Sequence, residues 1–258
     1  MEVSTIIMIV MIVLLFYIVV SYVMGGPRVI TSLTSARTMQ TVSPSSLDGA
    51  SANASPNFTY SIWIYLDDWN YRLGYVKPIL VRTGATLTDG GDDANDGETD
   101  EPATAAPVYC PKIVFQKNEN AIDIFIDCIT DEQPNKRVRD RCTVRNIPIQ
   151  KWVNLIVSVY GITEDIYLDG KLVKTRILPY PPAVTLLTTA ANAYITPSQG
   201  FSGFTNKFQY WGDAINPQQA WNTYQSGYGG NWVTNMFSQY SVKLSVMQGD
   251  TETTSISL

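Results

Sequence analysis

The sequence predicts an all-β protein, an antiparallel jelly-roll sandwich preceded by a single N-terminal transmembrane helix. Three observations carry this prediction. The chain opens with a long uncharged apolar run, the remainder contains many short segments of alternating apolar and polar residues, and turn residues separate these segments at short intervals. The first observation predicts an anchor in a bilayer. The other two are typical of an antiparallel sandwich.

The opening apolar run extends from Val3 to Met24 without a charged residue. A helix of that length reaches roughly 33 Å, against about 30 Å for the hydrocarbon core of a bilayer. Backbone polar groups in lipid must be satisfied within the segment, which favours a helix. We therefore expect residues 1–26 to form a membrane anchor. Its expected lipid contacts include Val3, Ile6, Ile12, Leu15, Phe16, Val20 and Met24.

A cleavable signal peptide and a buried helix of a globular domain are the alternatives to this anchor. A signal peptide has a basic start and a cleavage site of small residues. Here the run is preceded by Glu2 and ends in the sequence SYVM, so a retained anchor is favoured. Arg28 and Arg37 follow the run, and the positive-inside rule then predicts that the large domain faces the cytoplasm.

Composition excludes several classes of function. The net charge is −5 and the lysines and arginines form no run longer than Lys136-Arg137, which argues against a nucleic-acid partner. The chain has no histidine, so a Ser-His-Asp triad and the usual catalytic zinc sites are excluded. The cysteines Cys110, Cys128 and Cys142 are either reduced thiols or one disulfide with a free thiol. No cofactor and no metal site are predicted.

Two polar segments lie outside the predicted strands. Residues 27–56 are rich in Ser, Thr, Ala and Pro and are predicted to be a tether. Glycosylation sequons start at Asn53 and Asn57, and they would be used only in a secretory lumen. Residues 88–102 carry seven carboxylates and no cation. A solvated loop is favoured there over a calcium site, because the spacing does not match an EF-hand.

The body, residues 57–247, is predicted from period-two patterns along the chain. In NFTYSIWIYLDDW, the apolar residues Phe58, Tyr60, Ile62, Ile64 and Leu66 share one face of the first strand. The further predicted strands cover residues 75–84, 111–118, 121–128, 151–161, 164–175, 192–196, 203–212 and 240–247. Within the second of these strands, Pro78 predicts an edge position or a bulge.

Turn and capping residues delimit these elements. Asp169-Gly170 predicts a type I′ hairpin turn. Asn216-Pro217 predicts the start of a short helix that Gly227 ends. The charged segment 130–141 is predicted to be an exposed turn, the proline-rich segment 178–187 a loop, and residues 248–258 a polar tail.

Three stretches resemble the concanavalin A-like, or laminin G-like, jelly-roll superfamily. FTYSIWIYLDDW (58–69) resembles its opening strand, and KWVNLIVSVYGITEDIYLDGKLVKT (151–175) resembles its tryptophan-led strand and Tyr-x-Asp-Gly hairpin. GFSGFTNKFQYWGDAINPQQAWNTYQSG (200–227) resembles its late strand and short helix. The resemblance implies this fold for most of residues 57–228. The family usually carries histidines where this chain has Val153-Asn154, so its ligands are not implied.

Some relatives of this fold hydrolyse β-glucans, and the stretch AIDIFID (121–127) resembles their strand motif. The residues that would share one face of this strand are Ala121, Asp123, Phe125 and Asp127. A retaining glycosidase needs two carboxylates about 5 Å apart, and Ala121 stands at the nucleophile position. We therefore predict that the chain is not an enzyme, and that Asp123 and Asp127 lie on a solvent-facing side.

A lectin-like binding module is a further hypothesis, because aromatic faces suit the C–H face of a pyranose ring. The candidate ligand or partner contacts are Trp69, Tyr71, Tyr180, Trp211, Trp221 and Tyr228. Packing within the core is the alternative role for Trp63, Trp152 and Trp211, and it is favoured for these three.

The anchored jelly roll resembles minor virion proteins of large icosahedral DNA viruses, in which an internal bilayer lies beneath the protein shell. This resemblance implies a non-enzymatic structural protein at the virion inner membrane, with the large domain facing the capsid. The implied partners are the lipid bilayer and many copies of coat proteins. A membrane-anchored, lectin-like carbohydrate-binding module is the alternative.

Overall fold

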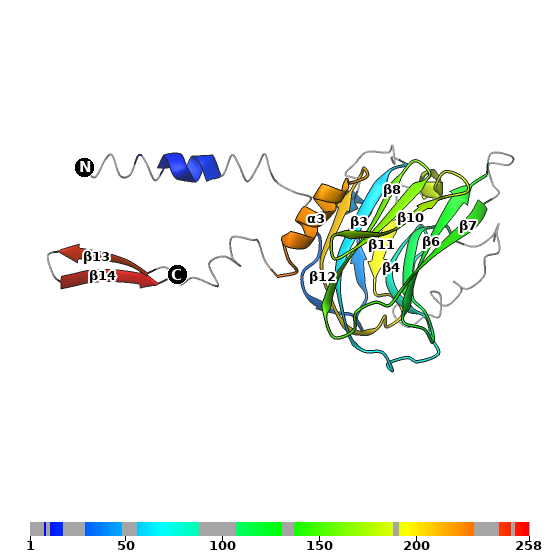
Figure 1. Ribbon diagram of the computed structural model, residues 1–258, viewed down its shortest axis with the longest axis horizontal. Coiled ribbons are helices and arrows are strands. Elements are labelled where there is room, and N and C mark those ends of the chain that lie inside the picture. Colours follow the sequence, from blue (N-terminus) through cyan, green and yellow to red (C-terminus); the bar gives the residue numbers. More distant parts are fainter. Residues whose placement is uncertain are drawn as a thin grey trace.

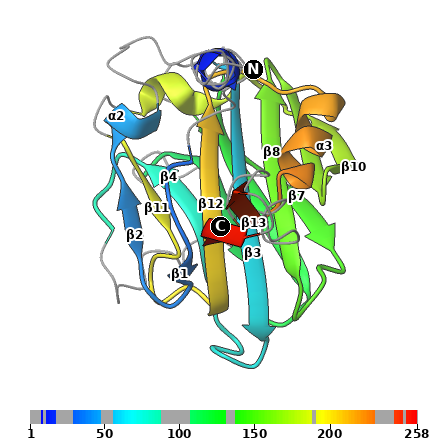
Figure 2. The same ribbon diagram turned by 90° about the vertical axis from the view of Figure 1, so that its left-hand side faces the viewer.

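The computed structural model describes residues 8, 11–17, 29–47, 56–87, 107–130, 137–187, 191–229, 243–248 and 251–257, the last two ranges by their backbone alone. The described body is a sandwich of two antiparallel six-stranded sheets (Figure 1). The predicted all-β antiparallel sandwich is therefore confirmed. Figure 2 shows the sandwich from the side, with the short helix α3 (Pro217–Gln225) beside β8 and β10.

The first sheet, called sheet A, has the strand order β1 (Thr34–Ser35), β12 (Ser202–Trp211), β3 (Phe58–Asp68), β8 (Trp152–Tyr160), β9 (Thr163–Leu168), β10 (Lys171–Ile177). The second, called sheet B, has the order β2 (Gln40–Val42), β11 (Asn192–Ile195), β4 (Lys77–Thr83), β5 (Tyr109–Phe115), β6 (Ala121–Ile129), β7 (Arg137–Arg145). The remaining elements are α2 (Pro44–Leu47), the 3-10 helix η2 (Ala183–Leu186) and a separate hairpin of β13 (Lys243–Gln248) and β14 (Thr251–Ser257).

The main core lies between the two sheets and follows from the period-two pattern of the strands. On β3 the five predicted apolar residues are all buried in this core. They lie beside alternate residues of β8 and β9 in the same sheet, such as Val157 and Ile166, and pack in one cluster with residues of sheet B, such as Ile113 and Ile124. Burying an aliphatic or aromatic side chain of this size contributes about 1.5–3 kcal/mol.

Local backbone signals place the turns and the helix as predicted. Asp169 and Gly170 have φ angles of 49° and 72°, as a type I′ turn between β9 and β10 requires. Asn216 caps α3, and Gln219 completes a reciprocal capping box with it. Pro78 lies at a register irregularity, but its strand β4 is interior, between β11 and β5. The bulge prediction is confirmed and the edge prediction is wrong.

The structure differs from the sequence-based prediction in three segments. The segment 130–141 is not an exposed turn from Arg137 onward, because β7 begins there and pairs with β6 along its length. Part of the predicted tether contributes β1 to sheet A and β2 to sheet B. Part of the predicted tail forms β14. Short polar strands of this kind carry little apolar pattern, so their partners decide their structure.

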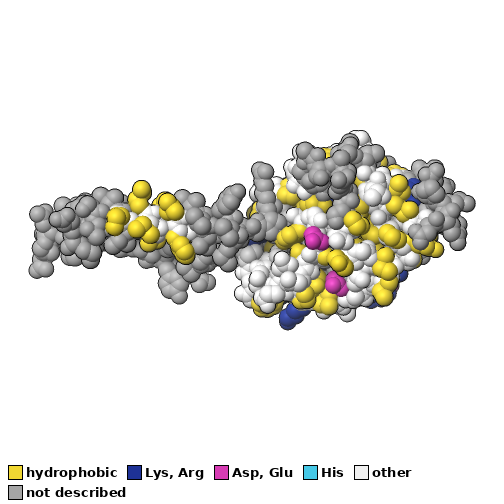
Figure 3. All heavy atoms as spheres, turned by 90° about the horizontal axis from the view of Figure 1, so that it is seen from above, with side chains coloured by type: hydrophobic (Ala, Val, Ile, Leu, Met, Phe, Trp, Pro, Cys, Tyr) yellow, Lys and Arg dark blue, Asp and Glu magenta, His cyan; other side chains and the backbone are white. Residues whose placement is uncertain are grey.

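The described residues of the predicted anchor form a helical stretch at 11–17. Here Ile12, Leu15 and Phe16 have side chains 59%, 62% and 68% exposed, and the hydrophobic atoms of the stretch lie at its surface (Figure 3). Among the described residues, no helix has both the length and the apolar character needed to cross a bilayer. The other four anchor contacts, Val3, Ile6, Val20 and Met24, lie outside the described residues. The anchor stays a prediction.

Candidate functional site

A cavity of ≈ 460 Å³ lies where the outer face of sheet A meets the end of α3. It is lined by Trp63, Lys151, Trp152, Tyr224, Gln225, Gly227 and Tyr228. Trp63 alternates with the core residues Ile62 and Ile64 on β3, so it projects from the opposite face of the sheet. We call this cavity and its lining the aromatic site.

Four rings of the aromatic site contact one another. Trp152 and Tyr228 are stacked, with ring centroids 4.7 Å apart, and Trp63 and Tyr224 are stacked at 5.7 Å. Trp63 also meets Tyr228 edge to face at 5.8 Å. Ring pairs of this kind contribute about 0.5–1.5 kcal/mol beyond their buried area. The contacts therefore join strands β3 and β8 to α3 and the turn that follows it.

Two side chains of a bulge in β12 hold that turn in place. The Lys207 ammonium donates hydrogen bonds to Ser226 Oγ at 2.8 Å, Gly227 O at 2.9 Å and Ser226 O at 3.2 Å. The Asn206 amide donates to Tyr228 O at 2.7 Å. Burial lowers the pKa of Lys207. A cation at the end of a helix also complements its dipole, so Lys207 fixes the turn that carries Tyr228.

The β9–β10 turn supports α3 from the other side. A Cβ atom at Gly170 would lie 2.9 Å from Tyr224 Cβ and 3.1 Å from Trp221 Cα, so a side chain there would displace the helix. Next to this turn, Asp169 accepts a hydrogen bond from Asn154 N at 3.0 Å and lies 3.5 Å from Lys151 Nζ. The hairpin therefore positions both the helix and the one lysine among the lining residues of the aromatic site.

Polar groups accompany the rings of the aromatic site. The Lys151 side chain is 62% exposed. The buried Trp63 Nε1 has no hydrogen-bond partner among the described residues. Aromatic walls with a few polar groups are the usual composition of a small-molecule site. The arrangement is suited to packing against a flat, partly apolar ligand and donating hydrogen bonds to it.

One predicted contact residue lines the aromatic site, and a second packs against one of its rings. Tyr228, which is 45% exposed, lines the aromatic site, and Trp221, which is 38% exposed, packs against Tyr224 at 5.5 Å. The predicted contacts Trp69, Tyr71 and Tyr180 lie elsewhere. Trp69 and Tyr180 pack against the main core, and Tyr71 lies under Arg37 at 4.5 Å.

Three residues of the aromatic site did not emerge from the sequence as contacts. Trp63 and Trp152 were expected in the core, and Tyr224 was not singled out. Trp63 is buried, as predicted, but it packs on the outer face of sheet A and not in the main core between the sheets. Trp152 is only partly buried and lines the same cavity, so the core prediction is wrong for this residue. Strand alternation was the available signal, since Trp63 lies between two core isoleucines. Trp211 also packs outside the main core, against a small cluster that includes Tyr167 and Ala220 of α3.

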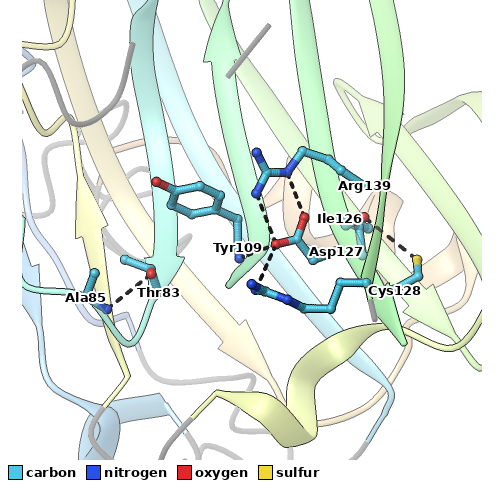
Figure 4. A network of polar contacts seen from close by, with 8 residues as sticks. Thr83, Ala85, Tyr109, Ile126, Asp127, Cys128 and Arg139 are labelled. Carbon is cyan, nitrogen blue, oxygen red and sulfur yellow. Dashed lines mark hydrogen bonds and ion pairs between the residues drawn. The ribbon is translucent and has the colours of Figure 1, made fainter. Parts of the chain in front are cut away.

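The two strand carboxylates predicted to face solvent are buried in ion pairs. Asp127 accepts hydrogen bonds from Arg139 Nε at 2.7 Å, Arg139 Nη2 at 3.1 Å and Tyr109 N at 2.9 Å (Figure 4). Asp123 accepts from Arg141 and Thr143, each at 2.6 Å. The two acids are 2% and 3% exposed, so the exposure prediction is wrong although they do share one face.

The cysteines and one sequon bear on the cellular compartment. Cys110, Cys128 and Cys142 are unpaired and buried, and burial raises the pKa of Cys128 to about 12 and that of Cys142 to about 11. The Asn57 amide nitrogen donates to Asp213 Oδ1 at 3.2 Å, and its oxygen accepts from Gly161 N at 2.8 Å. The amide that a glycan would modify is thus engaged within the fold. Asn53 and the segment 88–102 lie outside the described residues.

Solved structures share this fold at low sequence identity. The receptor-binding domain of botulinum neurotoxin D gives a TM-score of 0.51 at 10% identity over 78% of this chain and 45% of that domain. The CBM40 domain of the Ruminococcus gnavus IT-sialidase gives 0.50 at 10% identity over 75% of this chain and 96% of that domain. Against the binding domain of botulinum neurotoxin DC the TM-score is 0.44 at 11% identity over 67% of this chain, and the chain spans 36% of that domain.

The fold therefore places the chain in a structural class, the β-sandwiches that include carbohydrate-binding and receptor-binding domains. No protein-family model matches the sequence, and no curated protein is similar to it. At this low sequence identity, the structural similarities concern the fold alone.

Proposed function

We propose that the chain is a non-enzymatic binding domain whose aromatic site binds a carbohydrate. The observation that carries this proposal is the four-ring wall formed by Trp63, Trp152, Tyr224 and Tyr228. A pyranose presents an apolar C–H face to such a wall and hydroxyl groups at its rim. Lys151, whose side chain is 62% exposed, supplies donors for those hydroxyl groups.

The fold supports this proposal at a coarser level. The R. gnavus CBM40 domain, which shares the sandwich, is described as bound to α2,3-sialyllactose. The described carboxylates of the β6 strand are engaged in ion pairs with arginines, an arrangement suited to a structural role. Both points agree with a binding domain rather than a catalytic domain.

A glycan array with the detergent-solubilised full chain tests the carbohydrate proposal. We expect binding to one class of sugar, and loss of that binding in Trp152→Ala and Tyr228→Ala. Tyr160→Ala is the matched control, since this tyrosine is 67% exposed and does not line the cavity. Absence of binding by the wild-type chain, or equal binding by all variants, would exclude the aromatic site as a sugar site.

We also infer that residues 1–26 anchor the domain in a membrane, with the large domain on the cytoplasmic side. The uncharged run and the exposed apolar side chains of residues 11–17 support the anchor. The three unpaired cysteines and the engaged amide of Asn57 favour a reducing compartment over a secretory lumen.

This topology favours a second candidate function, a structural protein that links an inner virion membrane to a coat. Affinity for coat proteins would come from many tethered copies acting together. Deleting residues 1–26 in the cells that assemble the virion distinguishes the two candidate functions. A structural linker loses incorporation or normal membrane-to-coat spacing, and unchanged incorporation and spacing would contradict the linker.

A further inference from the structure

A second cavity, of ≈ 450 Å³, follows the outer side of the edge strand β7. It is lined by Gln116, Arg139, Asp140, Arg141, Thr143, Arg145 and Arg176. These described lining residues include four arginines and one carboxylate, and none is apolar. We call this cavity the arginine groove. It belongs to sheet B and the β10 edge and shares no lining residue with the aromatic site.

The arginines of the groove are spaced by the strand itself. Arg139, Arg141 and Arg145 occupy odd positions of β7 and pair across from Asp127, Phe125 and Ala121 of β6. Alternate residues of a strand lie about 7 Å apart on one face. Even-numbered neighbours such as Cys142 and Val144 point into the core instead. One face of β7 therefore carries three arginines along the groove, with Thr143 between Arg141 and Arg145, in a chain whose net charge is −5.

Neighbouring groups hold several of these guanidinium groups in position. Asp127 fixes Arg139 with two hydrogen bonds, and Asp123 fixes Arg141 at 2.6 Å. Arg176 reaches across from β10 to Asp140 Oδ1 at 2.6 Å and also donates to the Arg141 carbonyl. Groups held in this way lose little side-chain entropy when a ligand arrives.

The outermost arginine is accessible and weakly paired. Arg145 Nε lies 3.8 Å from Glu119 Oε2, beyond hydrogen-bond distance, and both side chains are 67% exposed. A ligand can therefore replace this ion pair at little cost, because exposed ion pairs contribute little to stability.

We propose that the arginine groove binds a tetrahedral oxyanion, either phosphate or sulfate, free or esterified to a larger molecule. Guanidinium groups match such anions with paired N–H donors, and an all-polar lining offers no surface for an apolar ligand. This site is independent of the carbohydrate proposal, since the two cavities share no lining residue.

Calorimetric titration of the full chain in detergent at low salt tests the groove. The probes are inorganic phosphate, inorganic sulfate and mannose 6-phosphate, with mannose as the uncharged probe. We expect the anions to bind and the binding to weaken as salt rises. Arg145→Gln should weaken it about tenfold, as loss of a charge-assisted hydrogen bond does. Arg145→Lys, which keeps the charge, should weaken it less.

Lys171→Gln is the matched control, because it removes one exposed positive charge outside the groove. If mannose 6-phosphate binds more tightly than phosphate, the ligand is an ester. If the two bind equally, the ligand is a free anion. Absence of anion binding, or the same effect for Arg145→Gln and Lys171→Gln, would overturn the proposal. Loss of anion binding in Trp152→Ala would also overturn it, since the anion would then occupy the aromatic site.

Discussion

Glu164 places a carboxyl group inside the sandwich, on the inner face of β9 and fully shielded from solvent. The Cys142 thiol is its neighbour for a weak hydrogen bond. Burial, and then the neighbouring Asp140, raises the pKa of Glu164 to about 8, while Arg176 and Lys174 oppose the shift. Near neutral pH the folded protein therefore holds this group protonated and uncharged.

Stability should accordingly fall as the pH rises through this range. Between its ordinary pKa of 4.5 and about 8, Glu164 keeps a proton in the folded state that the unfolded chain releases. The free energy of unfolding then decreases by about 1.4 kcal/mol per pH unit and levels off above the folded pKa. Glu164→Gln should remove this part of the slope. Urea unfolding of both proteins across this range checks it, and equal slopes would show that Glu164 does not titrate as described.

Two arginines of the same strand should differ sharply in their contribution to stability. Arg139→Met leaves Asp127 buried, with the more distant Arg137 at 3.7 Å as its remaining ion-pair contact. We expect a loss of about 3–5 kcal/mol, because the buried carboxylate loses its two shortest charged hydrogen bonds and stays out of water. Arg145→Met removes an exposed pair at 3.8 Å and should cost about 0–1 kcal/mol. Chemical denaturation measures both, and similar losses would contradict the burial assigned to Asp127.

At the scale of elements, the nine-residue helix α3 depends on its surroundings. A helix of this length is marginal by itself in water. The Asn216 capping box closes its first turn, while the Lys207 ammonium closes its last. Gly170 allows the β9–β10 turn to approach its backbone. The aromatic site therefore depends on these three features, which stabilise α3 and hold it against sheet A.

Lys207→Met should therefore release the end of α3. The variant loses three hydrogen bonds to residues 226 and 227, so we expect faster amide hydrogen exchange over 217–229 and weaker ligand binding at the aromatic site. Lys174→Met is the control, because this lysine donates to Thr143 O of β7, at 3.0 Å, and not to the turn after α3. Unchanged exchange over α3 in the Lys207 variant would show that the helix is held by other contacts.

At the scale of the whole molecule, the sandwich was predictable because β3, β8 and β9 carry strong period-two patterns and clear turn residues between them. Strand β7 was not, because its alternate arginines resemble an exposed turn until the pairing carboxylates of β6 are known. That pairing is a long-range contact that local pattern does not specify.

The candidate site was predictable only in part for the same reason. Exposed aromatic residues on and after α3 could be singled out: Trp221 lies within the helix, and Tyr228 follows it. The role of Trp63 and Trp152 depends on α3 folding back over sheet A, which brings residues about 160 positions apart into contact. Local sequence carries no signal for that docking.

The central claim is that a sugar ring packs against the aromatic site, and saturation-transfer NMR tests it most directly. The aromatic protons of the full chain are irradiated in the presence of a glycan that binds. The account predicts transfer to the C–H protons of one sugar ring, and its loss in Tyr228→Ala but not in Tyr160→Ala. Transfer that persists in the Tyr228 variant would contradict the account.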